Sequence, residues 1–377
     1  MSLPNVLHTC RRTLGVSLAC AVLLGGCSGE KPPVRLGYLG GLTGRTADLG
    51  TGGRNGIQIA IDEVNSAGGI NGRKIELVLK DDSNDPEKAK QLVQALIDAK
   101  VDAILGPMTS NVAAAVSPIV TEAKILMVGG SVTTNDLTGK DDLFFRTISA
   151  STVHAATMAE YLYTQRNVRK VNAAVNLSNK AYSESWILNF ERAFSQLGGQ
   201  VQRQVTYASS ADTNFAELTK ALLDGQPDAV ILVTNAVDAA LFANQVRLLR
   251  GKALMVTSEW AGTGKLTELG GSNVEGYIVP QYLDPQSSSP EFLAFRELYR
   301  QRFQQDVGFP AVVAFNAAQA VIKGLREKMP GESLKQAVLR LRRFPGLQGD
   351  VVFDDTGDVQ SRTYLTEIRN GQYFLVR

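Results

Sequence analysis

The chain has 377 residues, of which 44% are hydrophobic and 20% charged, so the composition is that of a globular protein of about two domains. It has 39 Lys and Arg against 37 Asp and Glu; two arginines lie in residues 1–26 without any acid, so the remainder carries 37 of each and is not expected to bind nucleic acid. Only two histidines occur and only His154 lies beyond residue 26, which argues against a multi-histidine metal centre or a histidine-based catalytic relay.

The N-terminal 26 residues have the pattern of an export signal, with two arginines followed by an apolar run that is too short to span a bilayer. Residues 24–27 read Leu-Gly-Gly-Cys and resemble the lipobox of bacterial lipoproteins, so we expect lipidation of Cys27 and a short tether over residues 27–33. Ser28 favours the outer membrane; the alternative is the extracellular face of a plasma membrane. All three cysteines lie at or before Cys27, so no disulfide is expected in the body of the chain.

Short β-rich runs alternate with amphipathic helical patterns from residue 34 onward. The runs expected to be strands are 34–39, 74–79, 101–105, 125–128, 143–148, 171–175, 201–207, 229–233, 254–257 and 277–279. Residues 54–66 predict a helix that stops at a glycine pair, and residues 86–99 predict one that starts with Pro86 after Asp85. This alternation predicts parallel sheets covered by helices on both faces, and more than eight strands predict two such sheets.

Several motifs of common cofactor sites are incomplete. Residues 262–267 lack both the hydroxyl residue and the first glycine of a phosphate loop. Residues 81–85 begin like a calcium loop, but Pro86 stands where glycine is required, so a capped helix start is the better interpretation. No nucleophile elbow occurs, and His154 is expected to be a surface or interlobe residue. We therefore expect no metal, no cofactor and no catalytic residues.

A set of motifs in a fixed order resembles a known family. Residues 65–73 read Asn-Ser-Ala-Gly-Gly-Ile-Asn-Gly-Arg and lead into a strand ending in two aspartates; further motifs lie at 105–107, 130–135 and 353–358. Together they resemble the type I periplasmic solute-binding proteins of ABC importers, nearest the leucine/isoleucine/valine-binding branch, over residues 34–377. The resemblance implies two doubly wound parallel-sheet α/β lobes joined by three crossing segments, with the ligand in the cleft between them.

The resemblance also predicts how the chain divides between the lobes. Residues 34–150 and 283–347 are expected to form lobe I, and residues 151–282 and 348–377 lobe II. The crossing segments are expected near residues 149–151, 281–285 and 352–358.

Candidate residues for the first half of the ligand site follow two strands of lobe I. In open α/β sheets, ligands lie at the carboxyl ends of the strands, and free N–H groups at a helix start favour a carboxylate. Ser110 begins a predicted helix after one strand and matches the family's carboxylate-contacting serine. Ser131 and Thr133 follow the next strand and match the positions that complete this contact. Capping of the helix by Ser110 is compatible with this role.

Candidate residues for the second half lie mainly in lobe II. Glu259 follows a strand and matches the acid that pairs with the ligand's α-ammonium in the family, while Tyr182 matches an aromatic wall of the pocket. Asn235, which follows another strand, is a further candidate. Leu49 stands where close relatives have an aromatic residue, and Trp260 where they have a small one, so branched aliphatic specificity does not follow from the resemblance.

The resemblance thus implies a lipid-anchored binding protein that captures a small amino acid, branched-chain or related, and delivers it to the membrane subunits of an ABC permease. We expect a monomer that performs no covalent chemistry. An amide, urea or plain carboxylate remains an alternative ligand, and a ligand-sensing receptor subunit an alternative role. A hydrolase on a two-lobe fold is disfavoured because no nucleophile–base pair is visible.

Overall fold

The structure, a computed structural model, describes residues 31–376. The expected export signal, its lipidated Cys27 and the neighbouring Ser28 lie outside the described residues. Within residues 31–376, no helix is both long enough and apolar enough to cross a membrane.

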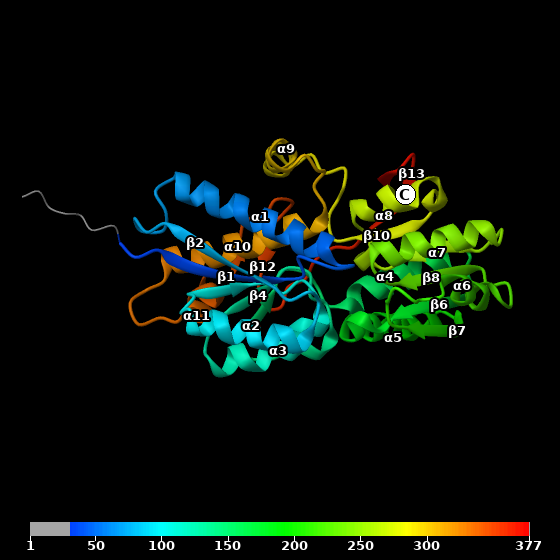
Figure 1. Cartoon of the computed structure of the whole chain (residues 1–377), viewed down its shortest axis with the longest axis horizontal. Coiled ribbons are helices and arrows are strands. Elements are labelled where there is room, and N and C mark those ends of the chain that lie inside the picture. The colour runs from blue at the N-terminus through cyan, green and yellow to red at the C-terminus, as the bar shows by residue number, and fades with distance from the viewer. Residues whose placement is uncertain (1–30, 377) are drawn as a thin grey trace, which may run out of the picture. The chain divides into compact units, whose positions relative to one another are not determined.

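The first sheet has five parallel strands in the order β2-β1-β3-β4-β5. Their bounds, with those of the intervening helices, are β1 Val34–Gly40, α1 Ala47–Ser66, β2 Ile75–Asp81, α2 Pro86–Asp98, β3 Ala103–Leu105, α3 Ser110–Glu122, β4 Met127–Gly129 and β5 Phe144–Arg146. Alternate residues of β1 enter different cores, because Leu36 and Tyr38 pack with α1 whereas Leu39 packs with α2 and α3. Figure 1 shows α1 and α10 on one side of the sheet and α2 and α3 on the other.

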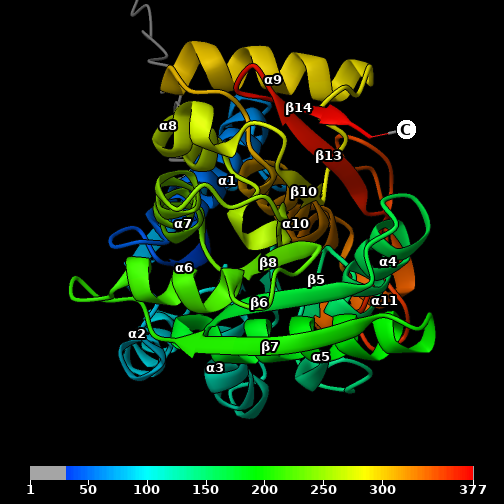
Figure 2. The same cartoon turned by 90° about the vertical axis from the view of Figure 1, so that its right-hand side faces the viewer.

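The second sheet has seven strands in the order β14-β13-β10-β9-β8-β6-β7. Its elements are α4 Ser151–Thr164, β6 Lys170–Asn176, α5 Lys180–Gln196, β7 Gln200–Tyr207, α6 Phe215–Leu223, β8 Ala229–Val233, α7 Ala236–Leu248, β9 Leu254–Thr257, α8 Gly264–Gly270, β10 Ile278–Gln281, β13 Tyr364–Arg369 and β14 Gln372–Leu375. Figure 2 shows the strands running in this order from β7 through β6 and β8 to β10 and β13. The strands from β6 to β10 are parallel, but β13 and β14 form an antiparallel edge that the sequence did not predict.

The remaining elements connect the two sheets. They are α9 Pro290–Phe303, α10 Phe309–Glu327, α11 Leu334–Leu341, and the short paired strands β11 Arg343–Phe344 and β12 Val351–Val352. The chain passes between the sheets after β5, after β10 and after β12, so three crossing segments are present and the predicted α/β fold is confirmed. The boundary expected after residue 347 would separate the paired strands β11 and β12; the division into lobes stays a prediction.

His154 lies where the crossing segments meet. It is fully buried, its Nδ1 is 2.6 Å from Thr363 Oγ1, and its ring centroid is 4.9 Å from that of Tyr282. Tyr282 follows β10, and Thr363 precedes β13. The surface alternative for His154 is therefore wrong, and the interlobe alternative agrees with these contacts.

Two helix starts show what local sequence can and cannot predict. Helix α2 starts as expected, with the Asp85 side chain accepting hydrogen bonds from the N–H groups of Glu87 and Lys88. Helix α1 starts at Ala47, seven residues before the prediction of 54, because its first half contains glycines that disfavour an isolated helix. One of its glycines, Gly56, is required by packing, since a Cβ there would lie 2.1 Å from the carbonyl oxygen of Ala311 in α10.

Candidate functional site

A small cavity of about 10 Å³ lies between residues of the two sheets. The described residues that line it are Leu49, Met108, Ser131, Asn179, Tyr182, Trp260, Tyr282 and Phe309. Four of these, Leu49, Ser131, Tyr182 and Trp260, were candidates from the sequence. The cavity is about the size of one water molecule, so the lining side chains are packed nearly closed around it.

Aromatic rings form most of the cavity wall. Tyr182 of α5 packs edge-on against Trp260, with ring centroids 5.7 Å apart, and Tyr282 packs edge-on against Phe309 with centroids 5.0 Å apart. Such T-shaped pairs hold each ring in a defined orientation. The cavity therefore has a rigid aromatic wall. Segments that adjoin the first sheet and segments that adjoin the second sheet both contribute rings to it.

Glu259 lies immediately after β9 in a short 3₁₀ turn, Glu259–Ala261, and is fully buried. Its Oε2 accepts hydrogen bonds from Tyr182 Oη at 3.0 Å and from Trp186 Nε1 at 2.9 Å. Its Oε1 has no hydrogen-bond partner among the described residues. Burial raises the pKa of Glu259 to about 7, although the two hydrogen bonds act in the opposite direction. The carboxyl group is thus oriented through one oxygen and can accept a hydrogen bond or a cation through the other.

The opposite group of candidates lies at the ends of β3 and β4. Ser110 is the first residue of α3, and its Oγ accepts hydrogen bonds from the N–H groups of Thr133 at 3.2 Å and Thr134 at 3.3 Å. A hydroxyl that accepts two bonds still has its own hydrogen to donate. Thr133 is fully buried; within the described part of the chain its Oγ1 makes no hydrogen bond of good geometry, although the Tyr282 hydroxyl lies close enough to interact with it. Ser131 donates its hydroxyl to the carbonyl oxygen of Met108 at 2.6 Å, which leaves this hydroxyl as an acceptor.

Asn235 is the one candidate whose contacts point to a local structural role. It is the N-cap of α7, where its Oδ1 accepts a hydrogen bond from the N–H of Asp238 at 2.9 Å. Like Ser110, Thr133 and Glu259, it is not among the residues that line the cavity itself.

Five residues near the site are not among the residues predicted from the sequence. They are Met108, Asn179, Trp186, Tyr282 and Phe309. Trp186 could have been found, because it lies one helical turn after Tyr182 on α5 and therefore on the same face. The others come from separate segments that only the tertiary fold brings together.

Polar contacts also join segments of the two sheets around the site. Arg45, which precedes α1, places its Nη1 2.7 Å from Oδ1 of Asp238 on α7, and its Nη2 donates to the carbonyl oxygen of Ser210 at 2.8 Å. Asp238 is fully buried and also accepts a hydrogen bond from Tyr207 Oη at 3.1 Å. Arg45 lies in a segment that connects strands of the first sheet, and Asp238 lies in a helix that connects strands of the second sheet. This ion pair therefore exists only while these two segments are in contact.

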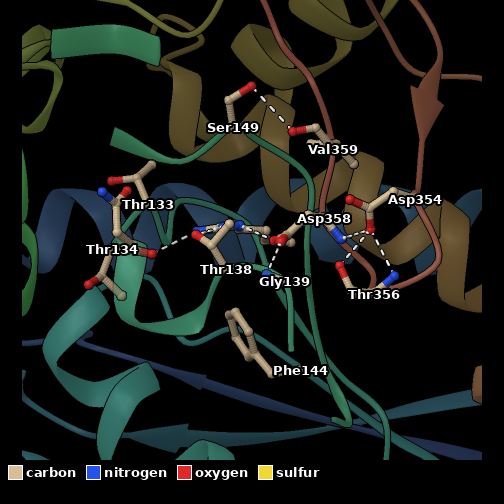
Figure 3. Close-up of polar contacts among 12 residues, drawn as sticks. Thr133, Thr134, Thr138, Gly139, Phe144, Ser149, Asp354, Thr356, Asp358 and Val359 are labelled. Carbon is tan, nitrogen blue, oxygen red and sulfur yellow. Dashed lines mark hydrogen bonds and ion pairs between the residues drawn. The ribbon is translucent and has the colours of Figure 1, made fainter. Parts of the chain in front are cut away.

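The loop after β4 is held by a second buried ion pair, Arg146–Asp358. Arg146 Nε lies 2.6 Å from Asp358 Oδ1, and its Nη1 and Nη2 donate to Thr134 O at 2.9 Å and Thr138 Oγ1 at 2.7 Å. Asp358 Oδ2 accepts a hydrogen bond from the N–H of Gly139 at 2.7 Å, and Figure 3 shows Asp358 beside this loop. The third crossing segment is thereby tied to the loop that carries Thr133.

Comparison with known proteins agrees with this architecture. The family model described as periplasmic binding protein matches residues 33–372. The chain is 26% identical over 364 residues to the Leu/Ile/Val-binding protein BraC3 of Rhizobium johnstonii, an alignment that covers 95% of this chain and 96% of that protein.

Solved structures share the fold. The branched-chain amino acid transporter substrate-binding protein LivJ of Streptococcus pneumoniae, in complex with isoleucine, aligns with a TM-score of 0.83 at 22% identity and covers 90% of this chain and 97% of its own. An ABC transporter solute-binding protein of R. palustris, in complex with benzoate, aligns with a TM-score of 0.82 at 20% identity and covers 91% and 95%. The prediction of a binding protein rather than an enzyme is confirmed. The family match extends over nearly all of the described chain, and this chain therefore belongs to the periplasmic binding protein family.

Proposed function

We propose that this protein captures a small α-amino acid and delivers it to an ABC permease. The observation that carries the proposal is the buried carboxyl group of Glu259, because one of its oxygens is held by Tyr182 and Trp186 while Oε1 has no partner in the described chain. A buried carboxylate is costly unless a charge or hydrogen-bond donor compensates it. The ammonium group of an α-amino acid supplies both.

The ligand's carboxylate is proposed to bind at the other side of the cavity. Thr133 Oγ1 makes no hydrogen bond of good geometry among residues 31–376, and the Ser110 hydroxyl retains a hydrogen to donate. Both residues lie beside the N-terminus of α3, where N–H groups and the helix dipole favour negative charge. Hydroxyl and backbone donors therefore suit a carboxylate without a formal counter-charge.

This arrangement would couple binding to closure of the protein. Glu259 follows a strand of the second sheet, whereas Ser110 and Thr133 follow strands of the first. A zwitterion can contact Glu259 and the Ser110–Thr133 group at the same time only when the segments that carry them are close together, so its full binding free energy is available only in the closed state. The Arg45–Asp238 pair adds a ligand-independent contact to the same closed state. The permease, or a signalling partner in the alternative role, would then recognise the closed form.

The relatives support an amino acid but also suggest a second candidate. BraC3 is named a Leu/Ile/Val-binding protein, and LivJ was solved with isoleucine. The R. palustris structure holds benzoate, and the aromatic wall of Tyr182, Trp260, Tyr282 and Phe309 could also pack against an aromatic carboxylate. A carboxylate without an ammonium group would leave Glu259 Oε1 without a partner, which is why we prefer the amino acid.

We further propose that the protein is anchored to a membrane through Cys27, with Ser28 directing it to the outer membrane in a cell that has two membranes. The support is the order of charge, apolar run, small residues and cysteine over residues 1–27. Cys27→Ser should move the protein from the membrane to the soluble fraction or leave it unprocessed. An unchanged distribution after membrane fractionation would rule out the anchor.

Calorimetry with a panel of L-amino acids, their des-amino analogues and benzoate tests the proposed ligand class. Wild-type protein should bind at least one amino acid and should bind its des-amino analogue far more weakly. Glu259→Gln keeps an oxygen that can accept hydrogen bonds from Tyr182 and Trp186 but removes the charge, and it should cost roughly 2–5 kcal/mol of binding free energy. The matched control is Glu268→Gln, because Glu268 pairs with Lys265 on the surface.

Two results would count against the amino acid. One is a loss of affinity below threefold in Glu259→Gln. The other is benzoate or a des-amino analogue binding as tightly as any amino acid, which would favour the plain carboxylate.

A further inference from the structure

Trp260 lines the cavity and carries a polar N–H group on its indole ring. This residue follows Glu259 in the chain and is 4% exposed. The indole Nε1 is buried, and no described residue accepts a hydrogen bond from it. An indole N–H can only donate, and buried donors in native proteins are nearly always paired. The cavity beside the ring is therefore the place where an acceptor would lie.

The unpaired buried atoms around the cavity can be matched to groups of a ligand. The proposed function assigns the α-ammonium to Glu259 Oε1 and the α-carboxylate to the side of Thr133 Oγ1. Trp260 Nε1 then remains, and neither an ammonium group nor an aliphatic side chain can accept its hydrogen. With the α-carboxylate held on the side of Thr133, a ligand that also pairs with Trp260 Nε1 needs a further acceptor on its side chain.

The lining of the cavity restricts what this acceptor can be. None of the eight described lining residues is a lysine, arginine or histidine, so an acidic ligand side chain would have no counter-charge. A hydroxyl or a carboxamide is a neutral acceptor, which this lining can accommodate without a counter-charge.

We propose that Trp260 makes this protein selective for an α-amino acid with a neutral polar side chain, a hydroxyl or a carboxamide, over its apolar counterpart. The inference rests on the proposed function, because it takes the positions of the two α-groups from it. Trp260 is a specificity residue in this account: its N–H bonds the ligand's side chain, and its ring closes the pocket.

Two pairs of amino acids of nearly equal shape test the inference. L-Threonine differs from L-valine by a hydroxyl in place of a methyl, and L-asparagine differs from L-leucine by a carboxamide in place of a branched alkyl group. Calorimetry on the wild-type protein should show at least one polar member bound about tenfold or more tightly than its apolar partner. In Trp260→Phe, which keeps an aromatic ring but removes the N–H, this ratio should fall to within about threefold.

A spectroscopic measurement keeps the test valid if Trp260→Phe does not fold. The chain has only two tryptophans, so its two indole N–H resonances can be assigned with a Trp186→Phe variant. The Trp260 indole proton should move downfield with the polar member of the preferred pair and not with the apolar member.

The possible outcomes distinguish a failure of the selectivity claim from a failure of the proposed function. If amino acids bind but the polar and apolar members of both pairs differ by less than threefold, or if the Trp260 proton responds equally to both members, the selectivity claim is overturned and the amino-acid site stands. If benzoate binds and no L-amino acid of the panel does, both claims fail.

Discussion

The buried ion pair Arg146–Asp358 should stabilise the fold far more than an exposed pair of the same length. Arg146 is 1% exposed in its side chain and Asp358 13% exposed. Asp358→Ala would leave the guanidinium buried with hydrogen-bond acceptors but no counter-charge, and it would also remove the acceptor of the Gly139 N–H. Breaking a buried pair from one side costs about 3–5 kcal/mol.

The chain contains a matched control in the pair Arg343–Asp350. Its N–O distance of 2.6 Å equals that of Arg146–Asp358, but its side chains are 66% and 40% exposed. Because exposed pairs are solvated in both the folded and the unfolded state, Asp350→Ala should cost about 0–1 kcal/mol. The two pairs have the same N–O distance but differ in burial, so the difference in stability between the two variants measures the effect of burial.

Urea unfolding followed by circular dichroism measures both variants. With a slope of about 3 kcal/mol per M, Asp358→Ala should lower the midpoint by roughly 1 M or more, and Asp350→Ala by no more than about 0.3 M. Asp358→Asn should fall between them, because the amide oxygen can still accept from Arg146. Equal midpoints for Asp358→Ala and Asp350→Ala would refute the reasoning from burial.

Three further predictions concern packing, closure and pH. Gly56→Ala should lower the melting temperature, because the new Cβ would lie 2.1 Å from the carbonyl oxygen of Ala311 and must push α1 away from α10, at about 1–3 kcal/mol. Arg45→Gln should weaken ligand binding about tenfold and shift small-angle scattering towards a larger radius of gyration, because the closed form alone contains the ion pair between Arg45 and buried Asp238 and would lose it. The pKa of Glu259 is raised from 4.5 to about 7, so the folded protein holds this proton more tightly than the unfolded chain, and Glu259 should contribute a fall of roughly 3 kcal/mol in ligand-free stability as pH rises from 4.5 to 7, measured as the difference between urea titrations of the wild type and Glu259→Gln.

Each of these has a control within the chain. Gly264→Ala should not destabilise, since nothing lies within 4 Å of a Cβ at that helical position. Arg35→Gln should leave binding unchanged, because Arg35 pairs with exposed Glu76 inside one sheet. Glu259→Gln should reduce the fall in stability between pH 4.5 and 7 by roughly 3 kcal/mol, while Asp82, whose pKa burial raises to about 6, keeps its own contribution. A lower stability of Gly264→Ala would contradict the packing argument, and weaker ligand binding by Arg35→Gln would contradict the closure argument. An unchanged pH dependence of stability in Glu259→Gln would contradict the argument from the Glu259 pKa.

The parts of the fold that the sequence predicts are those with local physical signatures. The inner parallel strands are apolar runs because both faces are covered, as in β8, where all five residues are buried. The edge strand β14 is short and only partly buried, so its pattern is weak. The first half of α1 was missed because its glycines have unfavourable helix propensity, and their close approach to other segments appears only in the tertiary structure.

The site was predictable to the extent that its residues follow strands. Glu259, Ser131 and Thr133 each come directly or nearly directly after a strand, and a parallel sheet gathers such positions at one edge. By contrast, Arg146 and Asp358 are 212 residues apart, and no local pattern links them. Tyr282 lies in a crossing segment, so its place beside the cavity depends on how the whole chain is folded.

The most direct test of the central claim is the number of protons released when the ligand binds. Burial raises the pKa of Glu259 to about 7, so at pH 7 about half of the ligand-free protein carries this proton. An ammonium group bound at Oε1 requires the carboxylate, and calorimetry in two buffers of different ionisation enthalpy should therefore report release of roughly half a proton per amino acid bound in the wild type and none in Glu259→Gln. Proton uptake on binding, or the same release from both proteins, would contradict the pairing of Glu259 with the ligand's ammonium group.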